Sequence, residues 1–233
     1  MIWRQREDTL MTVDVYSGAW WDEFSAYFSN EDLWDNGSRS LLLKYFAKFA
    51  VRDGGRRVLD VGCGPGIGTK RLNGMGFLAK GIDISPAMVE SAEARRVEAY
   101  LSDCDPIPEE DGTFDYVFCC TVVEWVRNPY GMIREMARVI KPGGGIVIAC
   151  LGPGNLPHEE ALKRLRGEPT NYNMLMPVEL HRMLLDCGLK IRSMTGARSH
   201  HISQETYAKL DWITKSYCSN LWMVGADKEG SLL

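Results

Sequence analysis

The stretch that most constrains the fold is VLDVGCGPGIGTKRL, residues 58–72. A short apolar run surrounds an aspartate, and glycines then occupy every second position from 62 to 68. Glycines let a turn pass close to another group, and the helix that follows exposes unpaired backbone N–H groups. We therefore expect a strand, a glycine-rich turn and a helix, with a ligand lying against the turn.

The composition indicates a globular protein without a polyanionic partner. The chain has 233 residues, of which 45% are hydrophobic and 25% charged, and this suits one domain with a sizeable core. A net charge of −4 argues against a surface for nucleic acid or an anionic membrane. No apolar run reaches the roughly 18 residues of a membrane span. The seven cysteines form no CxxC pair, so we expect reduced thiols, no metal site and a cytoplasmic protein.

Strand and helix patterns alternate along the chain. Ser85 followed by Pro86, and Asn128 followed by Pro129, are typical helix starts. Apolar runs predict seven strands, within residues 56–62, 77–84, 97–101, 114–120, 140–151, 188–196 and 220–228. This order predicts an α/β fold, a Rossmann-like doubly wound, seven-stranded, mainly parallel sheet with helices on both faces. Ligands of such sheets lie at the carboxyl ends of the strands.

The glycine pattern distinguishes two classes of cofactor. A dinucleotide-binding turn, GxGxxG, needs a small third residue at position 67, and this chain has Ile67 there. Instead, Asp60, Gly62, Gly64 and Gly66 form the pattern DxGxGxG. This pattern resembles the first motif of the class I S-adenosylmethionine-dependent methyltransferases.

Other segments resemble the later motifs of that family in the same order. GIDIS contains Asp83, which the resemblance assigns to both ribose hydroxyls, and Ile84, which it assigns to the adenine. A carboxylate suits a diol because it can accept two hydrogen bonds at once. SDCDPIP contains Asp103, which the resemblance places beside the adenine amino group. The fourth motif and the turn after it are similar to FDYVFCCTVVEWV (114–126) and IKPGGGIVI (140–148).

The resemblance implies S-adenosylmethionine as cofactor, S-adenosylhomocysteine as product and methyl transfer to a small-molecule acceptor by in-line displacement. The residues that it implies for cofactor binding are Trp20, Asp60, Gly62, Cys63, Gly64, Gly66, Asp83, Ile84, Met88, Asp103, Cys104 and Cys119. This chemistry needs mainly the alignment of the acceptor and the exclusion of water. Candidates for a general base, in segments expected to border the cavity, are Glu124, His158 and Tyr172.

The N-terminal segment concentrates aromatic residues in SGAWWDEFSAYFSNEDLW. Trp20 and Trp21 are adjacent and cannot share one helix face, so one of them can face the ligand. We expect a single methyltransferase domain over residues 1–233. Within it, residues 1–53 form an N-terminal helical lid, residues 54–151 a cofactor-binding half and residues 152–233 a substrate-side half.

Two alternative functions use the same fold. The chain could methylate tRNA or a protein, which would require a basic groove. It could also bind the cofactor without turnover. Cys119 and Cys120 are interpreted as buried thiols, because a cytosine-methylating cysteine would follow a proline. The Asp/Asn-Pro-Pro-Tyr tetrad of base amino-methyltransferases is absent after this strand.

Overall fold

The computed structural model describes residues 16–50, 55–153, 165–168, 172–173 and 175–230. The strands are β1 (Arg57–Val61), β2 (Leu78–Asp83), β3 (Ala99–Leu101), β4 (Phe114–Cys120), β5 (Ile140–Leu151), β6 (Leu189–Arg198) and β7 (Ser219–Lys228). The N-terminal helices are α1 (Gly18–Asp22), α2 (Ser25–Phe28), α3 (Asp32–Asp35) and α4 (Ser38–Ala50). The later helices are α5 (Ile67–Gly74), α6 (Pro86–Ala94), α7 (Pro129–Val139), α9 (Pro177–Asp186), α10 (Gln204–Lys209) and α11 (Trp212–Tyr217).

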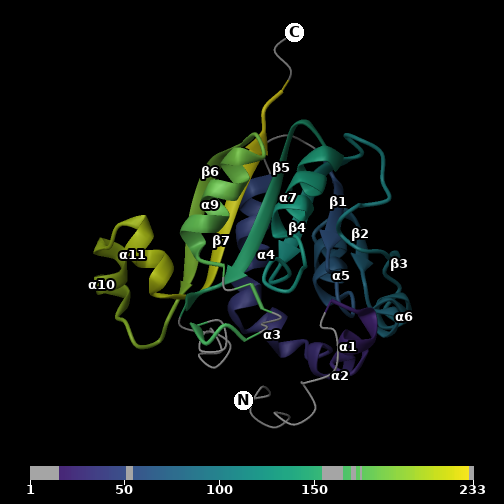
Figure 1. The fold of residues 1–233 in the computed structure, drawn as a ribbon, viewed down its shortest axis with the longest axis horizontal. Coiled ribbons are helices and arrows are strands. Elements are labelled where there is room, and N and C mark those ends of the chain that lie inside the picture. Colours follow the sequence, from purple (N-terminus) through teal and green to yellow (C-terminus); the bar gives the residue numbers. More distant parts are fainter. Residues whose placement is uncertain (1–15, 51–54, 154–164, 169–171, 174, 231–233) are drawn as a thin grey trace.

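The seven strands form one sheet in the order β3-β2-β1-β4-β5-β7-β6. Strands β1 to β5 pair in parallel, whereas β7 is antiparallel to both β5 and β6. The order reverses between β1 and β4, which is where doubly wound sheets bind ligands. Helices α1, α2 and α3 lie beyond the sheet end to which the β5 arrow points, the carboxyl end (Figure 1). The predicted fold class is therefore confirmed.

Two helix starts follow the local sequence. Ser85 accepts a hydrogen bond from the Met88 N–H at 3.1 Å, and Asn128 accepts one from the Gly131 N–H at 3.0 Å. A proline follows each cap, at a position where a helix lacks an N–H partner anyway. Both helices therefore begin where the sequence predicts.

Helices cover both faces of the sheet, and each face has its own core. Leu42 and Phe46 of α4 and Leu72 of α5 pack against one face. Met132 and Met136 of α7 pack against the other face, together with residues of α9. In Figure 1, α7 and α9 lie in front of the sheet and α4 lies behind it. Among the described residues, no helix is long and apolar enough to cross a membrane.

The excursion between β6 and β7 was not predicted from the sequence. Residues 204–217 form two short helices, α10 and α11, which project beyond the β6 edge of the sheet (Figure 1). Ser203 and Asp211 cap them by accepting hydrogen bonds from the N–H groups of Thr206 and Thr214, both three residues later. Each helix has six residues, so its apolar period is too short to stand out in the sequence.

Helix α4 approaches the sheet closely because Phe49 packs against two glycines. A Cβ atom at Gly145 of β5 would lie 2.7 Å from the Phe49 ring, and one at Gly225 of β7 would lie 2.6 Å from it. Arg192 of β6 lies over the Phe49 ring, with its guanidinium carbon 4.0 Å from the ring centroid. Small residues on two strands thus set the depth at which α4 sits.

We expect Gly145→Ala to lower the free energy of unfolding by about 1 to 3 kcal/mol, since an added methyl group must displace the Phe49 ring. Urea denaturation followed by circular dichroism measures this loss. Gly74→Ala is the matched control, because a Cβ there meets no atom within 4 Å. The control should leave stability unchanged or raise it by up to about 1 kcal/mol. Equal stability of both variants would show that α4 moves away without cost.

Candidate active site

A cavity of about 670 Å³ opens at the carboxyl ends of β1, β2 and β4. Its polar part is formed by the loops that follow these strands, and its aromatic part by the N-terminal helices and the segment after β4. Nine of the twelve residues predicted to bind the cofactor line it: Asp60, Gly62, Cys63, Gly64, Asp83, Ile84, Met88, Asp103 and Cys104. The sequence pattern thus located the polar part.

The first loop wraps around the end of β2. The N–H groups of Gly62 and Cys63 both donate to the Ile82 carbonyl at 2.9 Å. Gly62 has a φ of +69°, and a Cβ there would lie 2.3 Å from Val122, so a larger residue does not fit. At Gly64 the nearest atom to such a Cβ is 4.0 Å away, so the turn faces open space there. This accessible backbone is the surface against which the glycine pattern predicts a ligand.

Asp83 ends β2 and joins this loop to the next helix. Its Oδ2 accepts a hydrogen bond from the Gly64 N–H at 2.8 Å, and its Oδ1 accepts one from the Ser85 N–H at 3.0 Å. Burial raises the pKa of this carboxyl group, although both hydrogen bonds oppose the rise. Each oxygen keeps a lone pair, so the group can still accept from a ligand. An acid at a strand end would ordinarily support few contacts, but Asp83 also organises the fold of two loops.

Asp60 lies deeper, at 2% exposure, within β1. Its Oδ2 accepts a hydrogen bond from the Thr69 hydroxyl at 2.7 Å. Burial, opposed by that hydrogen bond, raises the pKa of Asp60 to about 7. A positively charged group bound nearby would lower this pKa and keep the carboxylate ionised.

The strand-three acid is also on the cavity wall. Asp103 accepts a hydrogen bond from the Cys104 N–H at 2.6 Å, which holds its carboxylate beside the loop. Asp103 and Cys104 line the same cavity as Ile84 and Met88. The two parts of the predicted adenine environment, apolar and acidic, are therefore brought together.

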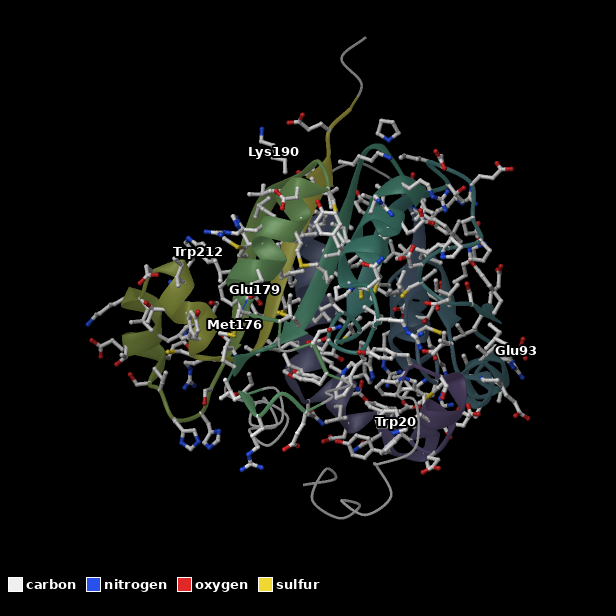
Figure 2. The ribbon with its side chains drawn as sticks, in the orientation of Figure 1. Trp20, Glu93, Met176, Glu179, Lys190 and Trp212 are labelled. Atoms are coloured by element: carbon white, nitrogen blue, oxygen red, sulfur yellow. The ribbon has the colours of Figure 1, made fainter. Side chains whose placement is uncertain are left out.

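The structure places Trp21, rather than the predicted Trp20, on the cavity wall. Trp20 is only 4% exposed and packs against Phe24, with ring centroids 4.5 Å apart. Figure 2 shows Trp20 among the N-terminal helices at the carboxyl end of the sheet. Adjacent residues of a helix point in different directions, and the sequence does not reveal which one faces the cavity.

A similar one-residue difference occurs at the end of β4. The predicted residue Cys119 is fully buried in the core, and its neighbour Cys120 lines the cavity instead. Side chains alternate between the faces of a strand. The Cys119 thiol is therefore buried, as expected from the sequence, and the predicted contact of its residue with the cofactor stays a prediction. Gly66 does not line the cavity either; it caps α5, and a Cβ there would lie 2.7 Å from Ala92 of α6.

Three charged residues of the cavity wall, Arg39, Asp105 and Arg127, were not predicted from the sequence. Arg39, in the first turn of α4, lines the cavity, with its guanidinium carbon 5.3 Å from the Trp34 ring centroid. Its positive charge opposes the rise in the pKa of the Cys120 thiol that burial causes. Within the described part of the chain, no ion pair or hydrogen bond of its side chain is found, and its guanidinium lies over the Phe28 and Trp34 rings. An unpaired guanidinium beside a ligand cavity is suited to bind an anion.

Two of the predicted bases, Glu124 and Tyr172, do not line the cavity. Glu124 is fully buried, and its Oε1 accepts a hydrogen bond from the Leu151 N–H. Its Oε2 has no hydrogen-bond partner among the described residues, and burial raises its pKa to about 7. Tyr172 is 3% exposed and packs against Trp125, with ring centroids 4.6 Å apart. His158 lies outside the described residues.

The N-terminal helices are fastened over the polar part. Asp22 of α1 accepts hydrogen bonds from the Ser85 hydroxyl at 2.5 Å and from the Ala87 N–H at 3.0 Å. A Cβ at Gly18 would lie 2.1 Å from the Ile84 carbonyl oxygen, so α1 rests directly on this loop. Farther along, Arg71 of α5 pairs with Glu31 and Asp35. These contacts hold the N-terminal helices, the predicted lid, against the loops at the carboxyl end of the sheet.

Comparison with known proteins agrees with this geometry. A family model described as "Methyltransferase domain" matches residues 59–148. The ubiquinone biosynthesis O-methyltransferase of Thiobacillus denitrificans is 33% identical over 157 residues, which cover 61% of this chain and 68% of the relative. The enzyme of the same name from Neisseria meningitidis is 29% identical over 216 residues, which cover 85% of this chain and 87% of the relative.

A solved structure shows the same fold. It is that of an S-adenosylmethionine-dependent methyltransferase, a possible histamine N-methyltransferase, from Thermotoga maritima. Its TM-score is 0.67 at 18% identity, over 90% of this chain and 98% of that one. The glycine-rich turn, the acids that end or follow successive strands and the similarity to these relatives lead to one conclusion: the chain belongs to the class I S-adenosylmethionine-dependent methyltransferases.

Proposed function

We propose that this chain transfers the methyl group of S-adenosylmethionine to a phenolic hydroxyl of a small aromatic acceptor. The observation that carries the proposal is the wall of the aromatic part, formed by Tyr16, Trp21, Tyr27, Phe28, Trp34 and Trp125. Aromatic walls favour flat rings, which they contact by stacking or edge to face. The names of the two relatives specify oxygen as the methylated atom in those proteins.

The polar part suits the nucleoside end of the cofactor. The spare lone pairs of Asp83 are available to both ribose hydroxyls, and the open backbone at Gly64 leaves room for close approach. We assign Ile84 to the adenine face and Asp103 to its amino group. Gly62, Cys63, Met88 and Cys104 complete this part of the wall.

The methionine part of the cofactor carries a carboxylate and an ammonium group. These groups require partners of opposite charge, and the cavity offers both. We assign Arg39 to the cofactor carboxylate and Asp60 to its ammonium group, with the Cys120 backbone between them. Asp60 is ionised above about pH 7, and a bound ammonium group extends that range downward. Trp20, Gly66 and Cys119 support neighbouring wall residues and do not contact the cofactor in this assignment.

When bound, S-adenosylmethionine supplies a methyl group activated by its sulfonium charge. The acceptor oxygen forms the new C–O bond, the C–S electron pair stays on sulfur, and the phenolic proton passes to water. Glu124 is assigned a structural role, because it holds the segment after β4 against Leu151. The chain's own contribution is the alignment of the acceptor beneath the N-terminal helices, in a cavity that still admits the water that takes the phenolic proton.

The remaining expectations belong to this proposal. Residues 1–233 work as one domain, in which residues 54–151, together with Arg39, hold the cofactor and the flanking residues shape the acceptor site. All seven cysteines are free, which supports a reducing compartment such as the cytoplasm. A small acceptor requires neither nucleic acid nor a membrane as partner.

A panel of phenols, catechols, carboxylic acids, amines and thiols tests the acceptor class. The protein is incubated with S-adenosylmethionine and each compound, and mass spectrometry detects S-adenosylhomocysteine and the methylated product. We expect products methylated on a phenolic oxygen. Turnover confined to amines, thiols or carboxylic acids would contradict the proposal.

We expect Asp83→Ala to raise the Kd for S-adenosylhomocysteine at least about thirtyfold, or about 2 kcal/mol, because two hydrogen bonds to a charged acceptor are lost. Isothermal titration calorimetry measures the change. Stability should also fall, by about 1 to 3 kcal/mol, since two backbone N–H groups lose their acceptor.

Asp115→Ala is the matched control for this stability loss. Asp115, near the start of β4, likewise accepts two backbone N–H groups, those of Arg56 and Arg57, each at 2.9 Å. It lies at the opposite end of the sheet, so the Kd should stay unchanged while stability falls. Wild-type affinity in folded Asp83→Ala protein would refute the ribose assignment.

The variant Arg39→Met tests binding of the amino-acid end of the cofactor separately from binding of its nucleoside end. We expect the Kd for S-adenosylhomocysteine to rise about tenfold or more, because a charge-assisted hydrogen bond is lost. The Kd for 5′-methylthioadenosine, which has no carboxylate, should stay within twofold. Asp83→Ala should weaken both ligands. A Met variant that weakens both equally, or neither, would remove Arg39 from the carboxylate.

A further inference from the structure

Thr121 has a backbone conformation that its side chain disfavours. Its φ is +55°, and Arg96 is the other non-glycine residue with positive φ within the described ranges. Arg96 terminates α6, and its N–H donates to the Glu93 carbonyl, so a left-handed residue is ordinary there. Thr121 follows a strand and is β-branched, and for such residues positive φ is a true outlier.

The surroundings fix this conformation through the backbone. The Thr121 N–H donates to the Ala149 carbonyl at 2.8 Å, which extends the pairing of β4 with β5 by one bond. The chain then turns, with the Trp125 N–H donating to the Val122 carbonyl at 2.8 Å. A glycine or asparagine would allow the same backbone bonds with less strain. The presence of threonine therefore points to its side chain.

Thr121 lies on the cavity wall, in the segment that forms a junction between Cys120 at the polar part and Trp125 of the aromatic part. Thr121 lines the cavity between Cys120, beside the proposed methionine end, and Val122, which packs on Gly62. Burial raises the pKa of the neighbouring Cys120 thiol to about 11, and the Thr121 hydroxyl opposes this rise. A threonine hydroxyl that donates one bond still has two lone pairs with which to accept.

Other polar groups near this junction already have partners. Asn128 accepts a hydrogen bond from the Gly131 N–H and donates one to Asp105 at 2.9 Å. The guanidinium carbon of Arg127, in the segment after β4, lies 5.0 Å from the Tyr16 ring centroid. Asp60 is bonded to Thr69, deeper in the sheet. Thr121 is thus a polar residue of the cavity wall, in the segment that joins Cys120 to the aromatic part.

We propose that Thr121 is a catalytic residue that binds the acceptor: its Oγ1 accepts the hydrogen bond of the acceptor hydroxyl and turns an oxygen lone pair toward the methyl group. This inference rests on the proposed function, in which the acceptor occupies the aromatic part. The backbone strain is retained because this position places the hydroxyl between the two ligands. The bond breaking and the fate of the proton are unchanged from those given above.

Three substitutions test this role. Thr121→Ser keeps the hydroxyl, Thr121→Val keeps the shape and the strain, and Thr121→Gly removes both the hydroxyl and the strain. We expect the Ser variant to keep kcat/KM within about threefold, and the Val and Gly variants to lose about tenfold or more. The Gly variant should unfold at the wild-type temperature or above it, so its loss of activity is not a loss of folding.

Binding measurements supply a readout apart from turnover. S-adenosylhomocysteine should bind all three variants within twofold of wild type by calorimetry. The first acceptor of the panel that the wild type methylates is then titrated into protein saturated with S-adenosylhomocysteine. Quenching of tryptophan fluorescence should report weaker acceptor binding to the Val variant than to the Ser variant.

The outcomes separate this inference from the proposed function. If the methylated compounds are not phenols, the proposed acceptor class fails, while the variants still test Thr121 with the compound that is methylated. Wild-type kcat/KM in Thr121→Val would overturn the role of the hydroxyl. Equal losses of S-adenosylhomocysteine and acceptor binding in that variant would also overturn it, since they would indicate a structural role.

Discussion

The site depends on one partly buried carboxylate that joins two loops. Asp83 accepts the N–H group of Gly64 from the first loop and that of Ser85 from the second. Ser85 in turn caps α6 and donates its hydroxyl hydrogen to Asp22 of the lid. A buried charge is costly unless it is hydrogen-bonded, so this position holds the turn, the helix and the lid in one arrangement. The parallel strands only bring these groups to the same edge; Asp83 fixes their relative positions.

Much of the fold could be predicted from the sequence because local signals agree with one another. The apolar runs of β1, β2, β4 and β5 are long enough to show their period, and Ser85 and Asn128 mark the helix starts. The acids lie at or beside the ends of successive strands, so the topology alone brings them together. The polar part of the cavity was therefore predictable to within a residue.

The aromatic part was less predictable, because it depends on side-chain direction and on contacts between distant segments. The choice between Trp20 and Trp21, and between Cys119 and Cys120, is decided by packing that no periodicity records. Arg39 begins an otherwise ordinary amphipathic helix, and only the packing of α4 brings it to the cavity. The positive φ of Thr121 has no signature in the sequence, since threonine is common in strands.

Glu124 illustrates how burial changes the meaning of a titratable residue. A carboxyl group with a pKa of about 7 would suit a general base, yet its side chain is enclosed in the core and bonded to Leu151. A base must reach the proton that it removes. The sulfonium activates the methyl group without such a base, so a perturbed pKa alone does not identify a catalytic group here.

The contacts of Asp22 also determine how long a nucleoside stays bound. Helix α1 rests on Ile84 and holds the Ser85 hydroxyl and the Ala87 N–H through one carboxylate. To swing away, it must give up these bonds, and a single one, at about 1.5 kcal/mol, already lowers the open population roughly tenfold. In the proposed function, the N-terminal helices would thus control the residence time of the spent cofactor, while the loops after the strands would control how tightly it binds.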